Sequence, residues 1–171
     1  MPPLTDSEFL LISKSDFNKL QNFADGAQLA RRSRRTIKQL QALVAKDRLT
    51  LAKLHLKDAT AVLKCSPSMN RAVVSRAYYA LYHAARAASY ISFGGDDYEQ
   101  HTTLPTKFPV DFPDSAVWRN RLKDARLERN RADYDPYPAG DADFSATAVR
   151  LVGEAKQFIK LTQSYLKLKS T

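Results

Sequence analysis

The stretch from Met69 to Tyr90 constrains the fold of this chain more than any other. It reads MNRAVVSRAYYALYHAARAASY, and its apolar residues recur at steps of three and four. This spacing predicts an α-helix about 33 Å long, at ~1.5 Å per residue, with one face in a core. Because alanine side chains are small, neighbouring helices can approach closely, which is typical of the central helix of a bundle. The residues of that face are Val74, Ala77, Tyr78, Leu81, Ala84, Ala85 and Ala88.

A second face of the same helix carries polar residues at the same steps, namely Arg76, Tyr79, His83 and Arg86. Two guanidinium groups, a phenol and an imidazole in one row could meet an anion. The alternative is that these groups are satisfied locally within the bundle.

Helical spacing of apolar residues predicts three more long helices. One covers Thr36 to Leu63, either as a single helix or as two joined near Asp47. The next begins at Asp114 or Ser115 and ends before Pro136, because proline and the residue before it disfavour helix. The last runs from about Asp143 to Lys167. The chain is therefore predicted to be all-α.

Some details of these helices are also predicted. In the first, Leu43 or Val44, Leu51 and Leu54 are expected to face the core, as is Val149 in the last. Ser68 is well placed to cap the central helix.

At the N-terminal end, a short helix is expected to be capped by Ser15 and to end near Gly26. Arg31, Arg32, Arg34 and Arg35 follow it. Four like charges in five residues form either a solvated face or a contact for phosphate.

A long connection, broken by Gly94-Gly95 and three prolines, separates the central helix from the next one. Connections of that length are often functional or mobile. A short helix is expected around Gln100 to Lys107. His101 would lie in it, and we interpret His101 as a structural or surface group.

Composition narrows the classes of partner and site. Lysine and arginine number 27 against 18 acidic residues, giving a net charge of +9. A polyanion, RNA or DNA more than a membrane, is the expected partner. The single cysteine, Cys65, excludes an intramolecular disulfide and a cysteine cluster and suits the cytoplasm. The three histidines lack the spacing of a metal site, so we expect no metal and no cofactor. No apolar run approaches the ~20 residues of a membrane span, so we expect no membrane partner.

The segment from Arg129 to Pro138 combines cations, an amide, carboxylates and two phenols. Arg129 and Asp133 stand four residues apart, so they can form an ion pair on one helix face. In the alternative, Arg129 presents its planar donors to a phosphate, Asn130 adds an amide, and Asp133 orients the guanidinium.

Three features together make the sequence similar to the HEPN family, in particular its small stand-alone prokaryotic members. They are Ser75-Arg76-Ala77-Tyr78-Tyr79-Ala80-Leu81-Tyr82-His83-Ala84-Ala85, His101 followed by Phe108, and Arg129-Asn130-Arg131-Ala132-Asp133-Tyr134. The similarity covers roughly residues 46–168, which we take as the core of a HEPN-like domain over 46–171. Residues 1–45 are then an N-terminal helical extension with a basic segment.

The resemblance implies an antiparallel bundle of four to five helices, a two-fold homodimer with a shared basic cleft, and action on RNA. Active members are metal-independent ribonucleases that use an arginine and a histidine separated by four to six residues. Arg129 matches the arginine, but Tyr134 stands where the histidine is expected, so the motif is degenerate. We therefore expect an RNA-binding protein of a toxin–antitoxin or defence-like system. The alternatives are an active ribonuclease, in which Arg129 and Asn130 act with His83 or Tyr134, and a non-catalytic adaptor or regulatory subunit.

Further arginines are expected to contact the nucleic acid: Arg76, Arg86, Arg126 and Arg131, with Arg31, Arg32, Arg34 and Arg35 of the extension. Some HEPN toxins are silenced by a nucleotidyltransferase that modifies a tyrosine near the motif. Tyr134 and Tyr137 are the corresponding candidates here, and a nucleotidyltransferase is the corresponding partner.

Overall fold

The computed structural model describes residues 5–7 and 17–169. The chain divides into two compact units, residues 1–40 and 41–171. The division falls within a long helix, α3 (Ile37–Val62), so each unit contains part of that helix.

In the first unit, helix α2 (Phe17–Ser33) ends where Arg34 takes a positive φ of 53°. The prediction that this helix ends near Gly26 is wrong, since the helix continues through the glycine at a cost of only ~1 kcal/mol. The predicted cap, Ser15, lies outside the described residues.

Helix α3 begins with a reciprocal cap that the sequence analysis overlooked. The amide of Gln39 donates to the Thr36 hydroxyl at 3.2 Å, and the amide of Thr36 donates to the Gln39 side chain at 2.9 Å. Two otherwise unpaired backbone donors are satisfied in this capping box. The helix then runs without a break at Asp47, so the single-helix alternative is confirmed.

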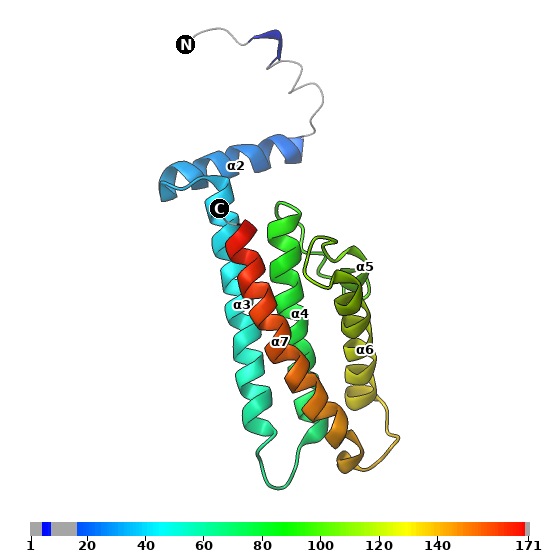
Figure 1. The fold of residues 1–171 in the computed structure, drawn as a ribbon. Helices are drawn as coiled ribbons and strands as arrows, with labels where there is room; N and C mark the ends of the chain where they lie inside the picture. The colour runs from blue at the N-terminus through cyan, green and yellow to red at the C-terminus, as the bar shows by residue number, and fades with distance from the viewer. Residues whose placement is uncertain (1–4, 8–16, 170–171) are drawn as a thin grey trace. The chain divides into compact units, whose positions relative to one another are not determined.

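The second unit is a bundle that contains the rest of α3, α4 (Asn70–Ser92), α6 (Ser115–Tyr134) and α7 (Ser145–Lys169). These four helices lie lengthwise, and each runs antiparallel to the one before it (Figure 1). Two short elements join them, α5 (Leu104–Lys107) and the 3₁₀-helix η1 (Asp141–Phe144). The described residues contain no β-strand, and the predicted all-α helical bundle is confirmed.

Helix α4 is buried along its whole length and on more than one face. Besides the predicted stripe, Val73, Ala80, Tyr82 and Ala87 are also buried. A helix that is apolar on most sides is surrounded by its neighbours, as expected for the centre of a bundle. The neighbours supply the large side chains, and Trp118, Phe108, Phe144 and Phe158 are among the largest that are fully buried.

The inward face of α3 differs from the one predicted, and in α7 the predicted position Val149 is exposed although Val152, Ala155 and Ile159 are buried. Leu43, Val44, Leu51 and Leu54 are all at least 38% exposed, and Val149 is 58% exposed. Instead, α3 buries Ala45, Leu49, Ala52 and Ala59, and α7 buries residues that include Ala148 and Leu151. The buried side of α3 therefore consists mainly of small alanine side chains, which allow close packing.

The cap of α4 also differs from the prediction. Ser68 does not cap the helix, and its hydroxyl donates to Asp141 Oδ2 at 3.4 Å. The Asp141 carboxylate itself accepts the backbone amides of Asn70 at 2.7 Å and Arg71 at 3.0 Å. The first turn of α4 is therefore capped by a residue 71 positions further along the chain.

Arg71, in the first turn of α4, binds the chain at and just beyond the C-terminus of α6. Its Nη1 donates to the carbonyls of Arg131, Ala132 and Asp135 at the C-terminus of α6, and its Nη2 donates to the carbonyl of Pro138. One guanidinium thus satisfies carbonyls that a helix end leaves unpaired.

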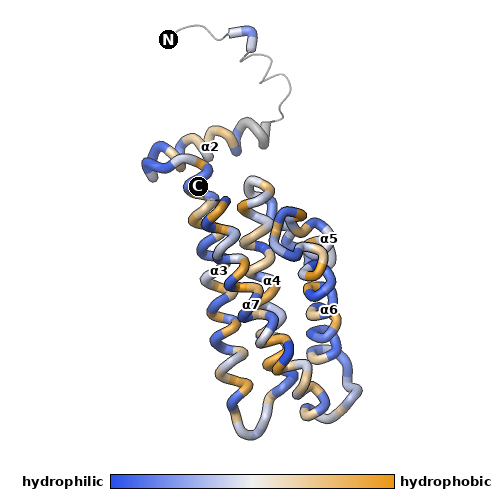
Figure 2. Tube along the Cα trace, viewed as in Figure 1, coloured by the Kyte–Doolittle hydropathy of each residue, from blue (hydrophilic) through white to orange (hydrophobic). Residues whose placement is uncertain are grey.

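Apolar and polar positions alternate along the helices (Figure 2). Within the part of the chain that the structure describes, none of the helices has the length and apolar character of a membrane span. His101 does not lie in a helix, because α5 begins only at Leu104. It lies in the turn just before α5.

Candidate functional site

Arg129, near the C-terminus of α6, is fixed by three polar contacts. Its Nε lies 2.7 Å from Asp133 Oδ2, its Nη2 donates to the Tyr79 hydroxyl at 2.9 Å, and its Nη1 donates to Asn130 Oδ1 at 3.3 Å. The Arg129 side chain is 16% exposed. The ion pair predicted between Arg129 and Asp133 is therefore confirmed, and it is partly desolvated.

Two tyrosine rings also contact this guanidinium. Its carbon lies 5.5 Å from the centroid of the Tyr79 ring and 5.0 Å from that of Tyr134. Both distances suit cation–π contacts. Tyr134 is 69% exposed, so its outer face is open to solvent. We call Arg129, Asn130, Asp133, Tyr134 and Tyr79 the Arg129 site.

The two motifs that carry the family resemblance meet at this site. Tyr79 belongs to the first motif and Arg129 to the third, and the Ser75 hydroxyl donates to Asp133 Oδ2 at 3.4 Å. They are about fifty residues apart in the sequence, and the antiparallel packing of α4 and α6 brings them together.

All three histidines of the chain gather beside the Arg129 site. His55 on α3 stacks on His83 of α4, with ring centroids 5.2 Å apart and an interplanar angle of 2°. His101 stacks on Tyr82 at 4.2 Å, and its Nδ1 lies 2.5 Å from the hydroxyl oxygen of Tyr78. We call the whole set the histidine–tyrosine cluster: His55, Tyr78, Tyr79, Tyr82, His83 and His101.

The three histidines are neutral at pH 7. Burial, together with the charges of the nearby His55 and Arg86, lowers the pKa of His83 to about 4. Burial and nearby arginines also lower the pKa of His55 and of His101. Each ring therefore keeps one nitrogen lone pair at physiological pH. Burial raises the pKa of Tyr78, so this phenol stays protonated.

Several buried polar atoms in this region have no hydrogen-bond partner in the part of the chain that the structure describes. They include Nδ1 of His55, Nδ1 of His83 and Nε of Arg126. Unsatisfied buried groups are rare in folded proteins and often occur at functional sites. Among the described residues, no group of three or more histidine, cysteine, aspartate or glutamate side chains has an arrangement that could hold a metal ion.

The other predicted binding residues lie at different distances from this site. The positive charge of Arg126 acts on the histidine–tyrosine cluster, because it lowers the pKa of His101. Arg86 is instead paired with Asp97, which it contacts at 2.7 Å and which also contacts Arg48. Arg131 pairs with Glu128 at 3.1 Å and lies over the Phe144 ring.

The remaining predicted residues are mostly exposed. Arg76 is exposed on α4, and Tyr137 is 80% exposed beyond the end of α6. Arg31, Arg32, Arg34 and Arg35 are exposed in the first unit. His83 lies in the histidine–tyrosine cluster, where the charges acting on it are led by His55, Arg86 and Arg48.

Sequence reasoning overlooked His101, Tyr78 and Tyr82 as parts of one site. A partial signal existed, because Tyr78 and Tyr82 stand four residues apart and so point to the same side of the helix. The return of the long connection to that side could not be read from the sequence.

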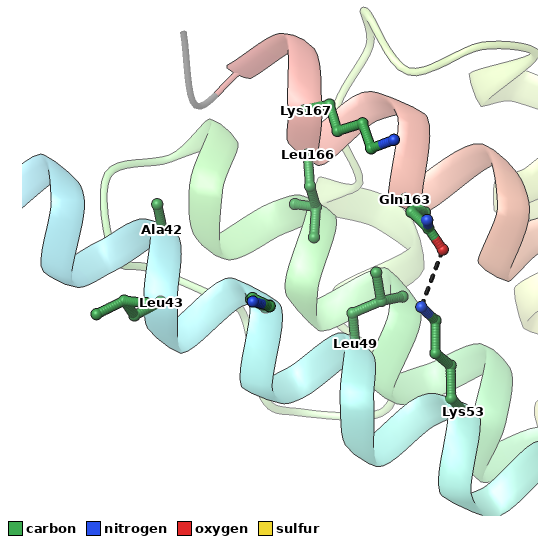
Figure 3. Close-up of a pocket in the computed structure, with 8 residues that line it drawn as sticks. Ala42, Leu43, Leu49, Lys53, Gln163, Leu166 and Lys167 are labelled. Carbon is green, nitrogen blue, oxygen red and sulfur yellow. Dashed lines mark hydrogen bonds between the residues drawn. The ribbon is translucent and has the colours of Figure 1, made fainter.

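A separate groove of about 360 Å³ lies between α3 and α7. Figure 3 shows Leu43 and Leu49 of α3 and Leu166 of α7 along it, with Lys53 donating to Gln163 at 2.9 Å. Lys46 and Lys167 also line it. The groove is mostly apolar and has no histidine, carboxylate or hydroxyl among its lining residues.

No known family model, no curated protein and no solved structure matches the chain. The fold and the site define an all-α bundle protein with an arginine–tyrosine site beside three neutral histidines.

Proposed function

We propose that this protein binds RNA and that Arg129 anchors a backbone phosphate. The observation that carries the proposal is the fixed guanidinium of Arg129, held by Asp133 and Tyr79 at the partly exposed end of α6. A guanidinium already oriented loses little conformational freedom when it binds a phosphate through parallel N–H bonds. The meeting of the two HEPN-like motifs at this residue supports the same function.

The surroundings suit a single-stranded RNA. Tyr134 lies over the Arg129 guanidinium and exposes its other face, on which a base could stack. Arg126 adds a second cation one helical turn away, and the net charge of +9 favours association with a polyanion.

Binding to a fluorescein-labelled mixed-sequence RNA, followed by fluorescence anisotropy over a range of salt concentrations, tests this proposal. Arg129→Ala removes one charge-assisted phosphate contact and should weaken binding about tenfold or more. Arg150→Ala is the matched control, because Arg150 on α7 also pairs with an acid four residues away. Equal affinity of the two variants, or an affinity independent of salt, would contradict the proposal.

A ribonuclease is the second candidate function. The observation that favours it is the presence of three neutral histidines beside Arg129, since neutral imidazole is the usual general base at pH 7. The predicted alternatives for the base were His83 and Tyr134. Tyr134 lies over the guanidinium, and a phenol is a less suitable general base than an imidazole at neutral pH.

The HEPN resemblance extends the proposal to partners. We propose a homodimer in a toxin–antitoxin or defence-like system, with a nucleotidyltransferase as the candidate partner. Tyr134 and Tyr137 are 69% and 80% exposed, so both hydroxyls can be reached by a modifying enzyme. Light scattering at micromolar concentration tests the dimer, and a monomer would contradict it.

A further inference from the structure

His101 is held in place by two tyrosines of α4. Its Nδ1 lies 2.5 Å from the hydroxyl oxygen of Tyr78, and its ring stacks on that of Tyr82 at 4.2 Å. The Tyr82 hydroxyl donates to the backbone carbonyl of Glu99, two residues before His101. Both the backbone of this turn and the His101 ring therefore contact α4.

The second ring nitrogen of His101 is available. His101 is exposed, and its Nε2 has no hydrogen-bond partner within residues 5–7 and 17–169. His55 and His83 differ, because both are partly buried and stack on each other, and the buried Nδ1 of each has no hydrogen-bond partner among the described residues. Of the three histidines, His101 is the one that a large substrate can reach.

His101 is also electrostatically linked to the Arg129 site. Among the charges that act on its ring, Arg129 is the strongest, followed by Arg126 and Arg86. Tyr79 connects the two residues, since its hydroxyl accepts a hydrogen bond from Arg129 and its ring meets that of His101 edge-on at 6.3 Å.

We propose that His101, and not a residue of the Arg129 motif, is the general base of a ribonuclease site on this bundle. The inference rests on the proposed binding of an RNA phosphate at Arg129. This role requires the tautomer in which Nδ1–H of His101 donates to the Tyr78 oxygen, so that Nε2 keeps its lone pair. Tyr78 is then a positioning residue, because its hydroxyl is hydrogen-bonded to Nδ1 and holds the ring in place.

In the reaction, Nε2 takes the proton of a ribose 2′-hydroxyl, and the 2′-oxygen forms a bond to phosphorus. The bond between phosphorus and the 5′-oxygen breaks, and this oxygen takes a proton from water. His101 then returns its proton to solvent. The products are a 2′,3′-cyclic phosphate and a 5′-hydroxyl, and Arg129 neutralises the charge on the phosphate.

The environment of His101 determines the expected pH dependence. Tyr78, Tyr82 and Arg86 face it from α4, Arg126 and Arg129 act from α6, and Glu99 lies in its own turn. Burial and then these arginines lower the pKa of His101 below 6.5. The base is therefore neutral at pH 7, and cleavage should fall only as the pH drops below 6.5.

Cleavage of a mixed-sequence RNA in EDTA by the full chain tests the inference, with RNA binding measured on the same preparations. His101→Gln should reduce cleavage at least a hundredfold while RNA binding stays within about threefold, since a general base contributes about 10²–10⁴-fold. Arg150→Ala should cleave like the wild type, and a mock preparation sets the background. Tyr78→Phe should lower the rate and change the pH profile, which a merely structural role would not do.

Three results would overturn the assignment. One is cleavage by His101→Gln within threefold of the wild type, and another is loss of cleavage in His83→Gln but not in His101→Gln. The third is RNA binding by the wild type without cleavage above the mock preparation, which leaves the proposed binding function intact. Absence of RNA binding by the wild type would remove the proposed function and this inference together.

Discussion

Replacement of Asp141 by alanine should destabilise the bundle although Asp141 lies in a short surface element. Its carboxylate accepts the backbone amides of Asn70 and Arg71 and the Asn70 side-chain amide at 3.0 Å. Loss of an N-cap costs about 0.5–2 kcal/mol, and loss of a negative charge at a helix N-terminus costs about 0.3–1 kcal/mol. We therefore expect Asp141→Ala to lower the free energy of unfolding by about 2 kcal/mol.

Such a loss should lower the melting temperature by about 4–8 °C for a chain of this size. Asp141→Asn keeps an acceptor but loses the charge, so its cost should be about half. The matched control is Asp143→Ala, because Asp143 lies in the same 3₁₀-helix and is exposed. Its cost should stay within about 0.5 kcal/mol.

The pH dependence gives a second test of the same cap. Burial would raise the pKa of Asp141, but the hydrogen bonds from Arg71 and Asn70 outweigh it and lower this pKa. The stabilisation is therefore complete above about pH 4 and is lost as the pH falls through the folded-state value.

Urea unfolding followed by circular dichroism at pH 7, 5 and 3 measures both effects. The difference between the wild type and Asp141→Ala should be constant from pH 7 to 5 and shrink at pH 3. A cost at pH 7 no larger than that of Asp143→Ala would refute the role of Asp141 as the cap of α4.

Two further predictions concern groups that hold the bundle together. Arg71→Lys should lower the free energy of unfolding by about 2 kcal/mol in the same urea assay. The reason is that an ammonium group cannot reach the four carbonyls that the guanidinium binds. The control variant Arg150→Lys should change this free energy little. Asp97→Asn should cost about 2–4 kcal/mol, because this buried carboxylate joins two arginines that would then repel each other. A high-salt buffer should reduce the second cost only slightly, and full recovery in salt would contradict burial of the group.

Local sequence patterns were sufficient to predict the long helices of the bundle. The central helix, the last two long helices and the class of the fold follow from spacing at three and four residues, which depends only on the geometry of one helix. The meeting of Arg129 and Asp133 could also be predicted, because residues four apart share a helix face.

Long-range packing decided the rest. The cap of α4 comes from Asp141 and not from the adjacent Ser68, because the carboxylate of η1 reaches two amides at once. Leu51 and Leu54 are exposed because α3 turns its alanine side to the bundle.

The candidate site shows the same division between sequence and tertiary structure. The sequence by itself determined that Tyr79, His83 and Arg129 lie on helices and that the chain is strongly basic. Only the tertiary structure brought His101 to Tyr78 and Tyr82, since the path of the connection after α4 depends on what it packs against. Periodicity is a local property of the chain, whereas the meeting of distant side chains depends on the packing of whole helices.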